Sequence, residues 1–195
     1  MTPLNNYEVI LASGSPRRYD FFKDLNIPFT IKIQQVDETF PPTLRGKEIS
    51  EFIVRRKNAP FINNIETKQI IITADTIVWC ENRYLGKPKN KKSAKEMLMF
   101  LSGKSHEVIT SVGFLTSRKF DIISETTKVY FKNLTDQEIE HYILKASPLD
   151  KAGAYGIQEW IGKIGITKIK GSYTNVVGLP LAQVIEKIKL LVQEG

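Results

Sequence analysis

Residues 69–79 read Gln-Ile-Ile-Ile-Thr-Ala-Asp-Thr-Ile-Val-Trp, a strongly apolar run of β-branched side chains that only Asp75 and Thr76 interrupt. Such side chains pack well on a pleated surface, so the run predicts a buried β-strand. A carboxylate in that position needs a partner, a metal or a chemical task, because burying an unpaired charge is costly. Asp75 is therefore the best single candidate for chemistry, although a hydrogen-bonded structural role is the commoner fate of a strand-borne aspartate.

Strands and helices are expected on both sides of this run. Residues 7–12 predict a strand that leads through a Ser-Gly-Ser-Pro turn into a helix with Pro16 at its first position. Further strands are expected at 29–33, 107–116, 122–132 and 164–169, and helices at 48–59, 94–101, 181–191 and after the capping box Thr135–Glu138. This mixture predicts an α/β fold with a mixed sheet, and without linker or repeat we expect a single domain, residues 1–195.

The composition is that of an ordinary globular protein, with 42% hydrophobic and 25% charged residues. A single cysteine, Cys80, excludes a disulfide framework, and the apolar stretch Ile70–Ala74 is too short to span a membrane. Residues 1–6 lack an export or acylation pattern, so we expect a cytoplasmic protein with no membrane partner. The net charge of +7 attracts phosphate-bearing partners, but charge alone leaves nucleic acid, free nucleotides and anionic membranes open.

Residues 11–18, Leu-Ala-Ser-Gly-Ser-Pro-Arg-Arg, predict an anion-binding turn. Backbone amides at a helix N-terminus lie beside the hydroxyls of Ser13 and Ser15 and the guanidinium groups of Arg17 and Arg18. The planar fork of arginine binds pairs of phosphate oxygens. Because cations at a helix N-terminus oppose the macrodipole, their presence favours an anionic ligand. The alternative is a capped helix with solvated arginines.

Three more charged residues are candidates for the same chemistry. Glu38 could complement Asp75 as a second metal ligand or base, since magnesium prefers one or two carboxylates plus substrate phosphates. Lys57, on the flank of a predicted helix, and Lys87 could neutralise a triphosphate. The alternatives are a surface loop acid and two snorkelling surface lysines. The two histidines have no metal-ligand spacing, and no serine-centred nucleophile motif occurs, which argues against covalent catalysis.

Five segments, taken together and in order, closely resemble the Maf family, and the match spans nearly the whole chain. They are residues 11–18, 74–78 (Ala-Asp-Thr-Ile-Val), 85–88 (Leu-Gly-Lys-Pro), 150–158 (Asp-Lys-Ala-Gly-Ala-Tyr-Gly-Ile-Gln) and 171–181, which begin with Gly-Ser-Tyr and end with Val-Gly-Leu-Pro-Leu. Any one of these segments would be weak on its own. Five of them in register are very specific.

This resemblance implies the fold of inosine triphosphate pyrophosphatases, an elongated mixed β-sheet flanked by helices, with two lobes and a cleft for the nucleotide. It implies hydrolysis of a nucleoside triphosphate between the α and β phosphates, dependent on a divalent cation such as magnesium or manganese. Asp75 matches the proton acceptor of the family. The other matching active-site positions are Ser13, Arg17, Arg18, Glu38, Lys57 and Lys87. A homodimer is also implied.

The resemblance extends to base preference. Arg17, Thr76 and Gln158 form the set seen in members that prefer dTTP and UTP, whereas members that act on 7-methyl-GTP carry Trp, Gln and Glu there. A side-chain amide pairs with a pyrimidine edge through one donor and one acceptor, so Gln158 is a sensible reader of uracil or thymine. The sequence departs from the family at Thr73, where glycine is more usual, and at Glu159, where a glycine is common after Gln158.

The sequence thus predicts a pyrophosphatase that hydrolyses dTTP and UTP, and modified pyrimidine nucleotides with them, in a nucleotide house-cleaning role. Whether Asp75 acts as base or as metal ligand stays open, because both roles need the same ionised group in the same place. One alternative is a non-catalytic, nucleotide-binding regulator of septum formation and cell division. Another is a nucleic-acid-binding module, but the chain lacks a zinc finger or an aromatic RNA-binding sequence, so we expect no nucleic-acid partner.

Overall fold

The computed structural model describes residue 4 and residues 6–194. The other residues, 1–3 and 5 of the N-terminal stretch without a targeting pattern and residue 195, lie outside the described part. The chain divides into two compact units. Unit 1 comprises the described residues within 1–75, with 110–124 and 178–194, and unit 2 comprises 76–109 and 125–177. Three long strands, β3, β5 and β6, contribute residues to both units.

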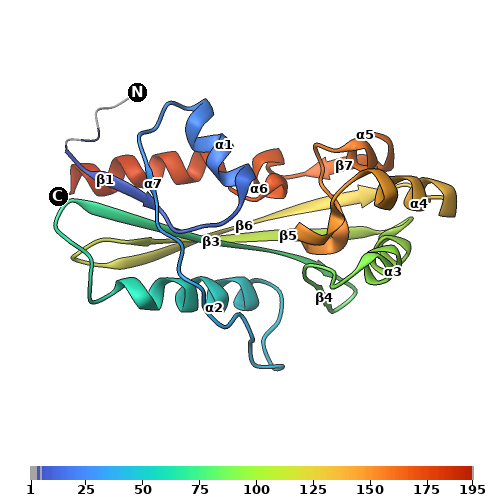
Figure 1. Cartoon of the computed structure of the whole chain (residues 1–195), viewed down its shortest axis with the longest axis horizontal. Helices are drawn as coiled ribbons and strands as arrows, with labels where there is room; N and C mark the ends of the chain where they lie inside the picture. Colours follow the sequence, from blue (N-terminus) through green and yellow to red (C-terminus); the bar gives the residue numbers. More distant parts are fainter. Residues whose placement is uncertain (1–3, 5, 195) are drawn as a thin grey trace. The chain divides into compact units, whose positions relative to one another are not determined.

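Unit 1 is a mostly buried sheet with helices on both faces. Its strands follow the order β2-β1-β3-β5-β6, and β1 pairs in parallel with both β2 and β3. Figure 1 shows α1 and α7 on one face of these strands and α2 on the other. The bounds are β1 Glu8–Leu11, α1 Pro16–Asp24, β2 Thr30–Ile31, α2 Lys47–Asn58, the 3-10 turn η1 Ala59–Phe61, β3 Gln69–Cys80, β5 Ser105–Leu115, β6 Phe120–Phe131 and α7 Leu181–Gln193.

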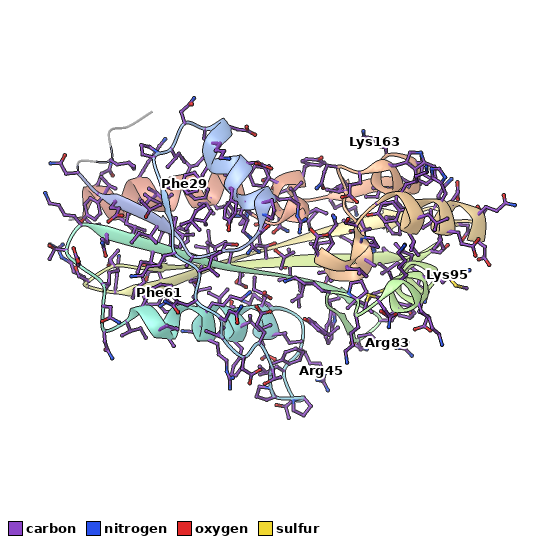
Figure 2. All side chains as sticks on the ribbon, viewed as in Figure 1. Phe29, Arg45, Phe61, Arg83, Lys95 and Lys163 are labelled. Atoms are coloured by element: carbon purple, nitrogen blue, oxygen red, sulfur yellow. The ribbon has the colours of Figure 1, made fainter. Side chains whose placement is uncertain are left out.

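The core of unit 1 follows the two-residue period of its strands. In β3, Ile70 and Ile72 pack with the side chains of α1 and α7, whereas Ile71 faces the other way. Ile71 packs with Phe61, which lies on the side of α2, while Phe29 lies on the side of α1 and α7 (Figure 2). Both faces of β3 are therefore buried, which explains why its sequence is apolar nearly throughout.

Unit 2 carries the other ends of the three long strands and a larger set of short elements. β4 pairs antiparallel with β3 through a turn in which Glu81 and Asn82 have φ of 48° and 61°. β7 pairs antiparallel with β6. The bounds are β4 Arg83–Leu85, α3 Lys91–Leu101, α4 Asp136–Lys145, η2 Pro148–Asp150, η3 Ala152–Ala154, α5 Trp160–Gly165, β7 Ile166–Lys170 and α6 Tyr173–Val177. The expected capping box is confirmed, with Thr135 accepting from the Glu138 amide.

The structure confirms the α/β class and corrects several boundaries. Helix α5 occupies 160–165, so the strand expected from residue 164 begins at Ile166. The sequence does not predict this helix because it contains two glycines, and glycine is a poor helix former. Glycine is needed at position 162, since a Cβ there would lie 2.1 Å from the Ile157 carbonyl oxygen. The short helix α6 was also not expected. The helix expected to reach Ala59 ends at Asn58, and Ala59 is exposed because a 3-10 turn that contains Pro60 follows.

Among the described residues, no helix combines the length and the apolar character that crossing a membrane requires. Cys80 lies buried at the end of β3.

A buried histidine lies in the core of unit 2. His106 is 2% exposed, its Nε2 lies 2.7 Å from the Tyr155 hydroxyl, and its ring packs on the edge of Phe131. Burial lowers the pKa of His106 to about 4, because the charged imidazolium loses its hydration. In the unfolded chain a histidine has a pKa of about 6.5, so the unfolded state takes up the proton first on acidification.

We therefore expect His106 to make the protein less stable in mild acid. Its contribution to stability is complete above about pH 6.5 and falls as the pH drops from there to about 4, by up to about 1.4 kcal/mol per pH unit. Urea unfolding at a series of pH values measures this slope. The His106→Gln variant keeps a partner for Tyr155 but cannot titrate, and equal slopes for the variant and the wild type would contradict the assignment.

Candidate active site

The turn between β1 and α1 is held by serine. Ser15 is the residue before the first helical position, and its amide donates to Ser13 Oγ over 3.2 Å. Ser13 is buried at 7% exposure, and its carbonyl accepts from the Tyr19 hydroxyl. Pro16 has no amide hydrogen. The turn therefore cannot offer an amide hydrogen at Ser15 or Pro16 to a bound anion. Binding an anion here would depend more on the arginines of the first helical turn.

Arg18 ties three segments of unit 1 together. Its Nε donates to the Gly178 carbonyl over 2.9 Å, and its Nη1 donates to the Ala74 carbonyl over 2.9 Å and to Ser13 Oγ over 3.1 Å. The side chain is buried, with 8% of the residue exposed. Arg18 thus positions the turn after β1 against the residue that precedes Asp75. Sequence reasoning gave it a phosphate-binding role, and this structural role comes in addition.

The two predicted carboxylates meet on one lysine. Lys57 projects from α2, and its Nζ lies 2.8 Å from Asp75 Oδ1 and 3.1 Å from Glu38 Oε1. The same ammonium group also lies 3.4 Å from the Ala74 carbonyl. Asp75 is nearly enclosed, with 11% of its side chain exposed, whereas 47% of the Glu38 side chain is exposed. The structure therefore brings together Asp75, Glu38 and Lys57, which are far apart in the sequence.

Arg18 contributes a second positive charge to this site. Burial lowers the pKa of its guanidinium group to about 10, while the negative charges of Asp75 and Glu38 oppose that fall and the neighbouring Arg17 adds to it. Arg18 therefore remains charged at neutral pH. Arg17 follows Pro16 in the first turn of α1 and is half-buried. The site of unit 1 thus combines two carboxylates with the cations of Lys57, Arg17 and Arg18.

Thr73, the residue two places before Asp75, departs from the glycine that the resemblance leads us to expect. Its side chain is fully buried, and its Oγ1 has no hydrogen-bond partner among the residues that the structure describes. A Cβ at Gly113 would lie 2.7 Å from that oxygen. Gly113 on β5 thus leaves the room that the threonine takes up.

The remaining predicted site residues belong to unit 2. Thr76 is half-buried on β3, Lys87 is exposed after β4, and Gln158 is half-buried in the loop before α5. The Gly153 amide donates to the Gly86 carbonyl over 3.2 Å. One backbone hydrogen bond thus joins the segment that carries Lys87 to the segment that carries Gln158.

Sequence reasoning missed a buried ionic cluster next to Gln158. Lys151 is 6% exposed, and its ammonium group contacts Asp150 over 2.6 Å and Glu159 over 2.9 Å. Lys151 lies within one of the five family-like segments, but nothing in its spacing signals that the side chain is buried. Only the fold brings Glu159 back over it.

The donor set of unit 1 fits a hard divalent cation. Magnesium is commonly bound by one or two carboxylates together with substrate phosphates, and Asp75 and Glu38 already converge on one positive group. Within the described residues, no cluster of three or more His, Cys, Asp or Glu side chains forms a metal cage. A cation held by two carboxylates and the substrate is therefore the arrangement that these residues suit.

Comparisons of the sequence with known proteins indicate one family. A family model described as Maf-like protein matches residues 8–191. A dTTP/UTP pyrophosphatase of Flavobacterium johnsoniae is 50% identical over 189 residues, 97% of this chain and 97% of that protein. A dTTP/UTP pyrophosphatase of Christiangramia forsetii is 52% identical over 186 residues, 95% of each. The Ham1 protein of Staphylococcus aureus is similar in structure alone, with a TM-score of 0.52 at 15% identity over 96% of this chain and 100% of that one.

Removal of Lys57 is expected to destabilise the fold through Asp75. Lys57→Met leaves a carboxylate that is 11% exposed without its nearest counter-charge, which should cost about 2 kcal/mol of unfolding free energy. Urea denaturation measures this loss. The double variant Lys57→Met, Asp75→Asn removes the charge as well and should regain most of the stability. A single variant as stable as the wild type would contradict the pairing.

Proposed function

The chain belongs to the Maf family, and on this basis we propose that it hydrolyses dTTP and UTP to the nucleoside monophosphate and pyrophosphate. Relatives with that activity in their names are about half identical to this chain over nearly its full length. The structural observation that carries the proposal is the convergence of Asp75 and Glu38 on the Lys57 ammonium group. Because the site contains two carboxylates, it can bind a polyanion only with positive charge from its own residues and from a bound cation.

Asp75 is the proposed proton acceptor. The oxygen of a water molecule attacks the α phosphorus, its proton passes to the carboxylate, and the bond from that phosphorus to the bridging oxygen breaks, so that pyrophosphate leaves. Lys57 Nζ lies 2.8 Å from Asp75 Oδ1 and places a positive charge beside the carboxylate before the attack. The enclosure of the side chain excludes bulk water from the group that takes the proton.

A divalent cation, magnesium or manganese, would be held by Asp75 and Glu38 and would supply positive charge to the phosphate oxygens. Because Asp75 suits either role, the division between base and ligand stays open. Glu38 is the more exposed of the two, with 47% of its side chain exposed against 11% for Asp75. It is therefore the better candidate for a pure ligand.

The other cations and the hydroxyls of the predicted site are assigned to binding the rest of the nucleotide. We assign Lys57, Lys87, Arg17 and Arg18 to stabilising the leaving pyrophosphate, because fixed cations lower the energy of the charge that builds there. Ser13 and Ser15 are assigned to the phosphate side of the turn. Arg17, Thr76 and Gln158 are assigned to base preference.

Gln158 is the proposed reader of the pyrimidine. Its Oε1 is buried and has no hydrogen-bond partner among the described residues. Uracil and thymine carry one ring N–H between two carbonyl groups, which an amide can match with one acceptor and one donor. A buried acceptor without a partner is costly, so a base that supplies the missing hydrogen bond is favoured over one that does not.

The wider expectations stay predictions. They are a single domain over residues 1–195, a nucleotide cleft, a homodimer and a cytoplasmic location. The rival reading, a regulator that binds nucleotide without cleaving it, has no specific support in the site. Release of pyrophosphate from dTTP or UTP in the presence of magnesium separates the two readings, and a panel that includes purine and methylated nucleotides defines the base preference.

Asp75→Asn is expected to lower kcat for dTTP and UTP about a thousandfold, because the amide cannot accept the proton of the attacking water. Pyrophosphate release at saturating magnesium measures the rate. Asp20→Asn, an exposed substitution of the same kind on α1, should leave the rate unchanged. Retention of most of the wild-type turnover by Asp75→Asn would show that the mechanism is wrong.

Glu38→Gln is expected to weaken binding of the divalent cation, because it removes one of the two proposed carboxylate ligands. The magnesium concentration for half-maximal rate should rise about tenfold, while saturating magnesium restores kcat to within about threefold. A chelator should abolish the activity of the wild type. Glu66→Gln, an exposed control in unit 1, should keep the wild-type magnesium dependence. An unchanged magnesium curve for Glu38→Gln would remove Glu38 from the cation site.

A further inference from the structure

Gln158 occupies a tight turn whose two ends meet on one hydroxyl group. The Glu159 amide donates to the Gly156 carbonyl over 3.0 Å, which places Gln158 at the third position of a four-residue turn. The Gly156 amide donates to the Tyr142 hydroxyl over 3.2 Å, and that hydroxyl donates to Glu159 Oε2. Tyr142 of α4 therefore ties the first and last residues of the turn that presents Gln158.

The other oxygen of Glu159 is held by a buried lysine. Lys151 has three N–H donors, and its ammonium group contacts the Ser147 carbonyl over 2.8 Å, Asp150 Oδ1 over 2.6 Å and Glu159 Oε1 over 2.9 Å. The Lys151 side chain is only 7% exposed. A buried ammonium that lost one of these acceptors would pay a desolvation penalty, so the cluster resists rearrangement.

Glycine at position 156 makes this arrangement sterically possible. A Cβ there would lie 2.9 Å from the carboxyl carbon of Glu159 and 3.1 Å from its Cγ. The Glu159 side chain thus folds back across the turn, over Gly156, to reach Tyr142 and Lys151. Burial, followed by the bond to Glu159, raises the pKa of Tyr142 well above its usual range, so its hydroxyl stays a donor at any working pH.

We infer that Glu159, held by Tyr142 and Lys151, is a positioning residue that fixes the Gln158 amide for uracil or thymine. This inference rests on the proposed function and adds to it residues that do not touch the base themselves. The turn is rigid because each oxygen of one carboxylate has a separate buried donor.

Binding of dTMP and dCMP to the full chain, measured by calorimetry, tests the inference apart from catalysis. The wild type should prefer dTMP. Tyr142→Phe and Glu159→Gln should each weaken dTMP binding about five- to tenfold, the effect of one misplaced hydrogen bond, and leave dCMP within about twofold. Glu96→Gln, an exposed control in unit 2, should bind like the wild type. The double variant should lose no more than Glu159→Gln alone, because both changes release the same turn.

Two outcomes would overturn the inference. The first is wild-type dTMP affinity in Tyr142→Phe and Glu159→Gln when both are folded by circular dichroism. The second is an equal loss for dTMP and dCMP, which indicates general damage. If Glu159→Gln fails to fold, Tyr142→Phe decides alone, since it keeps the ion pair with Lys151. Turnover of dTTP by the wild type tests the proposed function separately, and its absence would remove that function and this inference with it.

Discussion

The ion pair between Lys57 and Asp75 is the interaction on which the rest of the site depends. Asp75 interrupts a strand that is buried on both faces, and a carboxylate there is tolerated only with a counter-charge close by. Helix α2 supplies that charge because Ile49 and Ile53 bury its inner face and leave Lys57 at the edge. The same packing that stabilises unit 1 therefore places the Lys57 ammonium group 2.8 Å from Asp75 Oδ1.

Arg18 makes the surroundings of Asp75 rigid as well as positive. Its hydrogen bonds to the carbonyls of Ala74 and Gly178 and to Ser13 hold the guanidinium group in one place. A preorganised cation stabilises developing charge without a reorganisation cost during the reaction. Lys57 differs, since its flexible stem would let the ammonium group move from the two carboxylates to a phosphate of the proposed substrate. The site thus pairs one fixed cation with one adaptable cation.

Features that depend on neighbouring residues can be predicted from the sequence, whereas contacts that form only in the folded chain cannot. The strand around Asp75, the turn into α1 and the capping box at Thr135 follow from local pattern, and the structure bears them out. The α5 helix does not, because it contains two glycines, and Gly162 is required by the close approach of the Ile157 backbone. The sequence also predicted Asp75, Glu38 and Lys57 as site residues, but not that both carboxylates contact the Lys57 ammonium group. The pair of Lys151 with Glu159 has no local signal either, since each side chain has the sequence context of a surface charge.

The most direct test is a crystal of the wild type soaked with manganese and dTMP and measured at the manganese edge. The account predicts an anomalous peak within coordination distance, about 2.2 Å, of oxygens from both Asp75 and Glu38, with Lys57 turned away from at least one of them. A peak elsewhere on the protein, with Lys57 still bound to both carboxylates, would contradict it.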